Sequence, residues 1–371
     1  MLKLTHKVID FFGVKVNFKE WRMSIRDAAK IDKNFDIPSA ISKDGLAFYD
    51  ACELGVYGGE FRDGKFRRMD AQRAAEVGEY IFLISSESAG GRVKFATDSK
   101  KIAIIAEFGS MGKVANYSLS ATMGFDIFSG ERFVGVFVPP FSAQGSYESV
   151  IELAGADGSM QEYTINFPIC SEVTRLLIGV TDTSRILPGC RYKNDVPIVF
   201  YGSSTTQGAC ASHPGNSFPS ILSRALDSDI LNLAFWGNAK GEAEMARYIA
   251  ELDMTAFVYD YDYNAPTAEH LEATHEAMFK IIREKKPELP IIILSAPVPY
   301  PTATDLERCE IIKKTYLNAV NGGDKNVYFF SGSEVIAPVK NLALADNIHP
   351  GDVGFNAIAN AILPILKCAL K

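Results

Sequence analysis

Four short polar segments in the second half of the sequence hold the residue types that ester hydrolysis requires. The first, 202–208, contains two adjacent serines, and the others contain Gly237, Asn264 and the pair Asp346 and His349. A serine nucleophile needs a base to take its proton, a group that orients the base, and donors for the developing oxyanion. The four segments together offer a candidate for each of these parts.

The roles follow from the chemistry of each side chain. Ser204 would be the nucleophile, and His349 would act as general base and then general acid. Asp346, three residues earlier, would hold the imidazole tautomer and stabilise the imidazolium. The backbone N–H groups of Ser204 and Gly237 and the side-chain amide of Asn264 would form the oxyanion hole, since glycine allows close approach and Asn is a neutral donor.

The segment 202–208 alone is compatible with other chemistry. A phosphate-binding P-loop has four residues between its glycines and then a lysine, whereas five residues separate Gly202 from Gly208 and Ala209 follows. The Gly-x-Ser-x-Gly elbow of α/β-hydrolases is also absent. An ordinary strand-to-helix turn therefore stays open for this segment alone. Cys210 is a second candidate nucleophile, although a small buried thiol is the simpler interpretation.

Strands and helices alternate strictly after residue 196. Strands are predicted at 197–201, 230–235, 256–262, 290–295 and 326–331, and helices at 216–226, 240–252, 267–286, 304–320 and 353–369. Apolar strands that are buried on two sides indicate a three-layer α/β domain with a parallel five-stranded sheet. Ligands of such sheets bind beyond the carboxyl ends of the strands, so the four polar segments would lie along one edge.

The first half of the chain carries a β signal instead. Short runs rich in β-branched and aromatic residues occur at 80–84, 92–97, 101–106, 133–137 and 162–167, with turn residues between them. Such runs predict a β-sandwich or jelly roll. The predicted division is an N-terminal extension at 1–43, with a strand and a short helix packed on the β domain, then the β domain at 44–190 and the α/β domain at 191–371.

Composition limits the partners. The chain has 38 Lys and Arg against 45 Asp and Glu, a formal charge of −7, and no basic run, so nucleic acid and anionic membranes are not expected as partners. The six cysteines show no Cys-x-x-Cys pair, which indicates neither a metal site nor a disulfide framework, and no cofactor is expected. Charged residues near the N-terminus interrupt any signal-peptide core. We expect a cytoplasmic protein, or a secreted or periplasmic one if a leader precedes this sequence.

The order of the four segments resembles the SGNH (GDSL-type) hydrolases, which are named for Ser, Gly, Asn and His. The segments 124–128 (Gly-Phe-Asp-Ile-Phe), 238–242 and 260–266 resemble the branch whose N-terminal β domain bears a Gly-x-Asp-Leu-Tyr signature. This resemblance implies a flavodoxin-like SGNH hydrolase domain, preceded by a jelly-roll-like β domain, that acts without a metal. Three residues depart from the family pattern: Ser203 and Ala265 each replace an aspartate, and Asp262 replaces a glycine. These changes would reshape the acyl pocket without removing a catalytic group.

Enzymes of similar two-domain build remove acetyl groups from plant polysaccharides or oligosaccharides. The resemblance therefore implies a serine esterase for short-chain acyl esters, acetyl above all, on a small-molecule or oligosaccharide substrate. Asn238, Asp262, Tyr263 and His213 are the candidates for the substrate pocket. Two alternatives stay open: a lysophospholipase or thioesterase of the same family, and a non-catalytic carbohydrate-binding protein. A homo-oligomer is compatible with the sequence.

Overall fold

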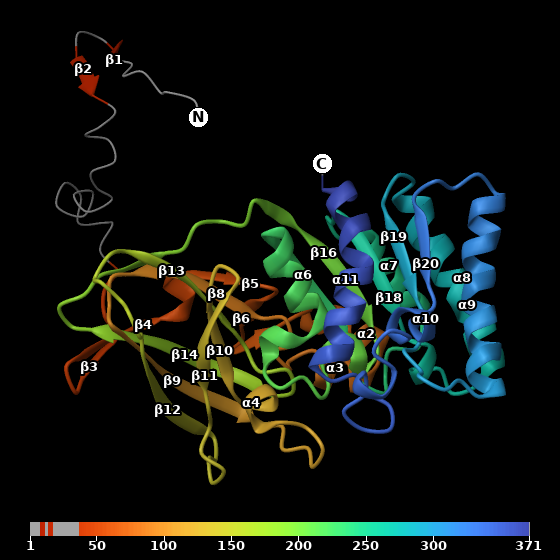
Figure 1. Cartoon of the computed structure of the whole chain (residues 1–371), viewed down its shortest axis with the longest axis horizontal. Coiled ribbons are helices and arrows are strands. Elements are labelled where there is room, and N and C mark those ends of the chain that lie inside the picture. The colour runs from red at the N-terminus through yellow and green to blue at the C-terminus, as the bar shows by residue number, and fades with distance from the viewer. Residues whose placement is uncertain (1–7, 12–13, 18–36, 371) are drawn as a thin grey trace.

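The computed structural model describes residues 8–11, 14–17 and 37–370 of the chain. A β-rich part, made mostly from the first half of the chain, lies beside an α/β part made mostly from the second half (Figure 1). Strands β1 (Val8–Phe11) and β2 (Val14–Asn17) pair antiparallel. The described residues resume at residue 37. The short helix predicted for the N-terminal extension lies outside them.

Two antiparallel sheets form the β domain. One has the order β11-β10-β13-β8-β15, with β5 also paired to β8, and the other has the order β12-β9-β14-β4-β3. Large apolar side chains from both sheets, such as Phe95, Ile104 and Phe125, are buried in one core, as in a β-sandwich. The strands are β3 (Ile41–Lys43), β4 (Leu46–Asp50), β5 (Gly55–Tyr57), β8 (Arg92–Thr97), β9 (Lys101–Ser110), β10 (Phe125–Ser129), β11 (Arg132–Phe137), β12 (Ser146–Glu152), β13 (Gln161–Asn166), β14 (Glu172–Thr181) and β15 (Ile186–Pro188). A separate hairpin pairs β6 (Glu60–Arg62) with β7 (Lys65–Arg67).

One predicted strand is wrong. Residues 80–84 belong to helix α3 (Glu79–Ile84), which follows helix α2 (Ala71–Val77). Ile81 and Ile84 are buried against the α/β domain, whereas Tyr80 and Leu83 are 65% and 55% exposed. The buried side chains are thus three residues apart, which is a helical spacing. A run that is apolar at every position hides this period from the sequence.

The α/β domain has a parallel sheet of five strands, as predicted, and the strand order is β17-β16-β18-β19-β20. Its strands are β16 (Asn194–Gly202), β17 (Ser228–Ala234), β18 (Ala256–Asp260), β19 (Ile291–Leu294) and β20 (Val327–Phe330). Its α-helices are α5 (Ser204–Gln207), α6 (Phe218–Leu226), α7 (Ala243–Glu251), α8 (Ala268–Lys285), α9 (Ala303–Asn321), α10 (Gly332–Ile336) and α11 (Asp352–Ala369). Residues of α6 and α11 share one core with the sheet, and residues of α7, α8 and α9 share the other. The three-layer α/β fold is confirmed.

The strand order determines where a site can form. Strand β16 lies between β17 and β18, so the chain leaves it toward one side first and toward the other side later. The carboxyl ends of these three neighbouring strands meet at this switch point, which is the usual ligand position of an open α/β sheet. Among the described residues, no helix is both long enough and apolar enough to cross a membrane.

Candidate active site

The turn after β16 presents one of its two serines. Ser203 is buried, and its hydroxyl accepts the Thr205 N–H as the N-cap of α5 while it donates to Asp260. Ser204 is the first residue of α5 and is only half-buried. Gly202 has no room for a side chain, because a Cβ there would collide with Asp260. The hydroxyl of Ser203 is therefore used within the turn, and the hydroxyl of Ser204 is the one presented.

Asp260, at the end of β18, holds this turn from the neighbouring strand. Its carboxyl group accepts the Ser203 N–H (3.2 Å), the Ser203 hydroxyl (3.3 Å) and the Thr206 hydroxyl. Burial raises the pKa of Asp260 to about 8, against the opposing effect of these hydrogen bonds. Asp260 thus connects the nucleophile turn to the strand that ends near Asn264.

The titration of Asp260 predicts a pH dependence of stability. The unfolded residue ionises near its ordinary pKa of 3.8, whereas the folded one stays protonated up to about pH 8. The unfolded state therefore binds fewer protons than the folded state in this window. The contribution of Asp260 to the free energy of unfolding falls as the pH rises from about 4 to 8. We expect the urea midpoint of Asp260→Asn to fall less steeply over this range than that of the wild type.

A matched control for this experiment is Asp253→Asn, on the surface before β18. It should keep the wild-type slope of urea midpoint against pH. Equal slopes for Asp260→Asn and Asp253→Asn would show that Asp260 does not titrate in this window.

Ser204, His349 and Asp346 form a continuous chain of hydrogen bonds. Ser204 Oγ lies 2.8 Å from His349 Nε2, and His349 Nδ1 lies 2.8 Å from Asp346 Oδ2. Because an ionised carboxylate only accepts, Nδ1 carries the imidazole proton and Nε2 accepts the serine proton. This is the tautomer that a general base needs.

The carboxylate of Asp346 is held in the ionised form. Its Oδ1 atom accepts the backbone N–H groups of Ile348 (2.7 Å) and His349 (2.6 Å). Burial alone would raise the pKa of Asp346, but the hydrogen bonds from His349 and Ile348 hold it well below the ordinary value. At neutral pH the group can therefore stabilise a positive charge on the His349 ring.

Gly237 and Asn264 lie together after β17 and β18. Gly237 has a φ of +65°, a backbone conformation that favours glycine. Its N–H donates to Asn264 Oδ1 (3.1 Å), and Asn264 Nδ2 donates to the Phe235 carbonyl (3.1 Å). The Asn264 amide carries a second N–H. The two predicted oxyanion residues are thus brought into contact, with the Gly237 N–H directed at Asn264.

Three of the predicted pocket residues are within two positions of Gly237 or Asn264 in the sequence. Asn238 donates to the Trp236 carbonyl (2.8 Å). The Asp262 carboxylate is buried, accepts the N–H groups of Ala296 (2.8 Å) and Tyr263 (3.0 Å), and has its pKa raised by burial to about 6. Asp262 and Tyr263 line a small cleft of about 40 Å³. Asp262 therefore ties the end of β18 to the end of β19.

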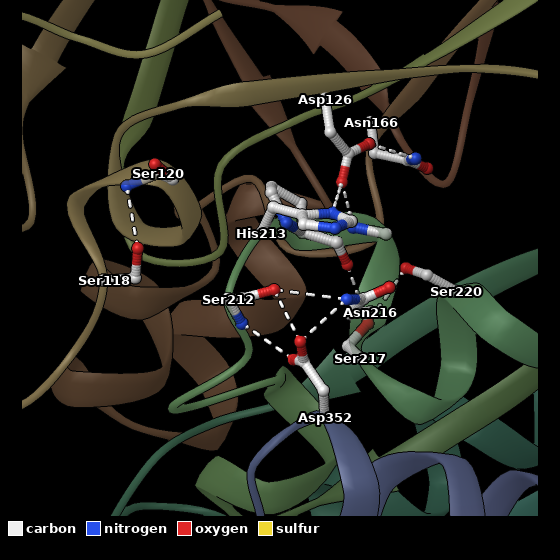
Figure 2. A network of polar contacts seen from close by, with 12 residues as sticks. Ser118, Ser120, Asp126, Asn166, Ser212, His213, Asn216, Ser217, Ser220 and Asp352 are labelled. Atoms are coloured by element: carbon white, nitrogen blue, oxygen red, sulfur yellow. Dashed lines mark hydrogen bonds and ion pairs between the residues drawn. The ribbon is translucent and has the colours of Figure 1, made fainter. Parts of the chain in front are cut away.

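His213 lies in a network that joins the two domains. Figure 2 shows its ring directed at Asp126, and Nδ1 is hydrogen-bonded to that carboxylate. Asp126 also accepts the Gly215 N–H and the Asn166 amide (2.6 Å). The His213 ring stacks on Phe133, with centroids 4.7 Å apart. His213 thus contacts the β domain through the aspartate of the 124–128 segment.

Two residues of the β domain reach the catalytic chain of hydrogen bonds, and sequence reasoning missed both. Asn116 Nδ2 donates to Asp346 Oδ2 (2.6 Å), and the Tyr117 hydroxyl lies 3.4 Å from His349 Nε2. They come from the loop between β9 and helix α4 (Leu119–Thr122). No local pattern marks them, because their partners are 230 and 232 residues away.

A second missed group supports the loop that carries Gly237. The partly buried Glu87 carboxylate accepts from Gln207 Nε2 (2.5 Å) and from the Trp236 indole N–H (3.1 Å). Gln207 Oε1 accepts the Trp236 backbone N–H (3.1 Å). The end of α5 and the loop after β17 are therefore joined through a carboxylate of the β domain.

One group of described residues has atoms close enough together to ligate a metal: Cys210, Asp346 and His349. Burial raises the pKa of the Cys210 thiol to about 12, which disfavours the thiolate that a metal would need. The same thiol is a poor nucleophile. Asp346 and His349 are already bonded to each other, so this group is better explained as part of a Ser-His-Asp arrangement.

Two family models match the chain, and together they cover both domains. The GDSL-like lipase/acylhydrolase family matches residues 195–367, and the N-terminal domain of SGNH-hydrolase-type esterases, with its GxDLY signature, matches residues 46–186. The fold is that of the three-layer α/β hydrolases, and the contacts among Ser204, His349 and Asp346 fit this class. The chain belongs to the SGNH (GDSL-type) hydrolases, in the branch with an N-terminal β domain, and this membership supports ester hydrolase activity.

Solved structures share this architecture. A protein from Bacteroides ovatus described as a GDSL-like lipase is 26% identical, with a TM-score of 0.77 over 87% of this chain and 98% of its own. The salicylyl-acyltransferase SsfX3 of a tetracycline biosynthetic pathway is 18% identical, with a TM-score of 0.68 over 90% and 98%. A family two carbohydrate esterase from Clostridium thermocellum, solved with cellohexaose, is 16% identical, with a TM-score of 0.55 over 85% and 99%. No curated protein matches the chain.

Proposed function

We propose that this protein is a serine esterase that removes short-chain acyl groups, acetyl above all, from carbohydrate esters. The observation that carries the proposal is the hydrogen-bonded chain from Ser204 through His349 to the ionised Asp346. A serine hydroxyl bonded to an imidazole, which is itself oriented by a carboxylate, is the arrangement that activates a hydroxyl for acyl transfer.

The reaction would proceed in two acyl transfers. Ser204 Oγ attacks the ester carbonyl while His349 Nε2 takes its proton, and the imidazolium then returns that proton to the leaving alcohol oxygen. Water attacks the acyl-serine in the second half, again with His349 as the base. Asp346 stays ionised throughout and stabilises the imidazolium in each half.

The oxyanion would be bound by the Ser204 N–H and the second N–H of the Asn264 amide. The Gly237 N–H could join them if it exchanged Asn264 Oδ1 for the substrate oxygen. We expect Asn264→Ala to lower kcat by about 10²–10³-fold, because one donor to the developing charge is lost. Hydrolysis of p-nitrophenyl acetate measures this loss.

The control for this variant is Asn318→Ala, an exposed residue of α9 whose amide donates to Glu276 of the neighbouring helix α8. Its kcat should equal that of the wild type. A loss of less than threefold in Asn264→Ala would remove Asn264 from the oxyanion site.

Two observations support a carbohydrate ester as the substrate. Several structural neighbours are carbohydrate esterases by name, among them an acetyl xylan esterase from Butyrivibrio proteoclasticus. Beside the two predicted oxyanion residues, Trp236 is 45% exposed and Tyr263 is 37% exposed. Exposed aromatic rings with one polar end suit ligands that are partly apolar and partly wet, as sugar rings are. The formal charge of −7 also favours an uncharged substrate.

The decisive experiment compares acyl and alcohol parts separately. We expect the rate to fall steeply from p-nitrophenyl acetate through the butyrate to the octanoate. We also expect the protein to release acetate from acetylated xylo-oligosaccharides. A preference for lysophospholipid or an acyl thioester would assign the same chemistry to another substrate. Binding of oligosaccharide with equal p-nitrophenyl acetate rates for wild type and Ser204→Ala would identify a non-catalytic binding protein.

A further inference from the structure

The catalytic hydrogen bonds do not end within the α/β domain. The loop between β9 and α4 extends from the β domain to the turn before α11 and brings two consecutive residues, Asn116 and Tyr117, onto Asp346 and His349. Asn116 contacts Asp346 Oδ2, on the Nδ1 side of the imidazole, and Tyr117 contacts His349 Nε2 on the other side.

Asn116 completes the hydrogen bonding of the Asp346 carboxylate. The Oδ2 atom of Asp346 accepts from His349 Nδ1 (2.8 Å) and from Asn116 Nδ2 (2.6 Å), while Oδ1 accepts two backbone N–H groups. The Cys210 thiol is 3.5 Å from Oδ2. Every donor except Asn116 comes from the α/β domain. Without Asn116, the oxygen that orients the imidazole would lose its shortest side-chain contact.

Tyr117 acts on the other side of the ring. Its hydroxyl lies 3.4 Å from His349 Nε2, and its ring meets the imidazole edge to face, with centroids 5.5 Å apart. In the proposed reaction, Nε2 is the atom that returns a proton to the leaving oxygen. Burial raises the pKa of the Tyr117 hydroxyl, so this group stays protonated and can donate to that oxygen.

We propose that Asn116 and Tyr117 are positioning residues of the catalytic triad, so that the β domain completes the active site and the α/β domain alone is incompletely assembled. Asn116 fixes the Asp346 carboxylate, and Tyr117 fixes the imidazole and the approach of the leaving alcohol. This inference rests on the proposed esterase function. Asn116 and Tyr117 lie outside the four segments that contain Ser204, Gly237, Asn264 and His349.

The first test is Asn116→Ala. We expect kcat for p-nitrophenyl acetate to fall by roughly 10- to 100-fold, as misplaced catalytic groups do, with KM within twofold. Loss of a donor leaves more negative charge on Asp346, which stabilises the His349 imidazolium, so the acidic limb of kcat/KM should move to higher pH. Asn116→Asp adds a like charge and should move that limb further. In the described part of the chain, the other titratable groups that contact His349 and Asp346 are Tyr117 and Cys210, and burial raises the pKa of both above the range tested.

The second test is Tyr117→Phe, measured on two kinds of leaving group. Nitrophenolate leaves without a proton, so the loss of rate on p-nitrophenyl acetate should be several-fold smaller than the loss on an ester whose leaving oxygen must be protonated. An alkyl or sugar acetate needs a proton on its leaving oxygen, and its rate should fall by about 5- to 20-fold. The controls are Asn318→Ala and Tyr80→Phe, both exposed and distant from the triad in the sequence, and both should match the wild type.

The outcomes separate this inference from the proposed function. If Ser204→Ala abolishes hydrolysis while Asn116→Ala and Tyr117→Phe stay within twofold of the wild type on both esters, the inference is overturned and the esterase stands. If Asn116→Ala lowers kcat only together with thermal stability, and the pH profile does not move, the residue is merely structural and the inference also falls. Equal rates for wild type and Ser204→Ala would defeat the esterase proposal itself.

Discussion

Ser204→Ala should reduce kcat for ester hydrolysis by on the order of 10⁵–10⁶, and His349→Ala should reduce it by a similar factor. The two residues share one proton transfer, across the 2.8 Å contact between Ser204 Oγ and His349 Nε2. The double variant should therefore be no slower than the slower single variant. Initial rates on p-nitrophenyl acetate, with enzyme at high concentration, measure all three.

The neighbouring serine provides a sharp comparison. Ser203→Ala removes the N-cap of α5 and a contact to Asp260, but leaves the Ser204 hydroxyl in place. It should destabilise the turn by about 1 kcal/mol while retaining most of the turnover. The exposed Ser142→Ala should be silent in both measurements. If Ser203→Ala were inactive and Ser204→Ala active, the nucleophile would be assigned to the wrong serine.

Arg68→Ala should be the most destabilising single change among those considered. Its side chain is 2% exposed, and the guanidinium donates to four backbone carbonyls, those of Ile84, Glu87, Asn232 and Ala234, at 2.6–2.9 Å. Removal would leave these acceptors unpaired and would take away the positive charge that favours the ionised form of the partly buried Glu87. We expect the free energy of unfolding to fall by about 3–5 kcal/mol, measured by urea denaturation at pH 7.

Arg68→Lys tests whether the planar fork of donors matters. A lysine ammonium is a point charge and cannot reproduce four contacts in fixed directions, so a partial loss is expected. Arg247→Ala serves as the control, because its exposed pair with Glu244 should contribute under about 1 kcal/mol. A loss of less than about 1 kcal/mol in Arg68→Ala, equal to that control, would contradict the role of Arg68 as the internal link between the domains.

The α/β domain was predictable to within a few residues at most element ends. Its buried parallel strands appear in the sequence as uninterrupted apolar runs, and its helices separate them at regular intervals. The residues that follow β16, β17 and β18 could be placed at one edge for the same reason. The strand order, which brings these three ends together, follows from packing and is visible only in the fold.

Other features could not be predicted from local pattern. The sequence predicts a strand where helix α3 lies, because a run that is apolar throughout has no readable period. Asn116, Tyr117 and Glu87 lie in loops, and their importance depends on partners more than 100 residues away. Likewise, His213 contacts Asp126 across the domain boundary, and the local sequence around either residue does not predict this pairing.

The long separation between Asn116 and Asp346 has a consequence for synthesis. The two residues are 230 positions apart, and a ribosome adding 5–20 residues per second needs roughly 10–50 s to make the chain between them. The β-sandwich strands are all made before the first strand of the parallel sheet, whereas Asp346 and His349 emerge just before the final helix. The β domain therefore has time to fold before the chain contains Asp346 and His349, which the proposed hydrolysis requires.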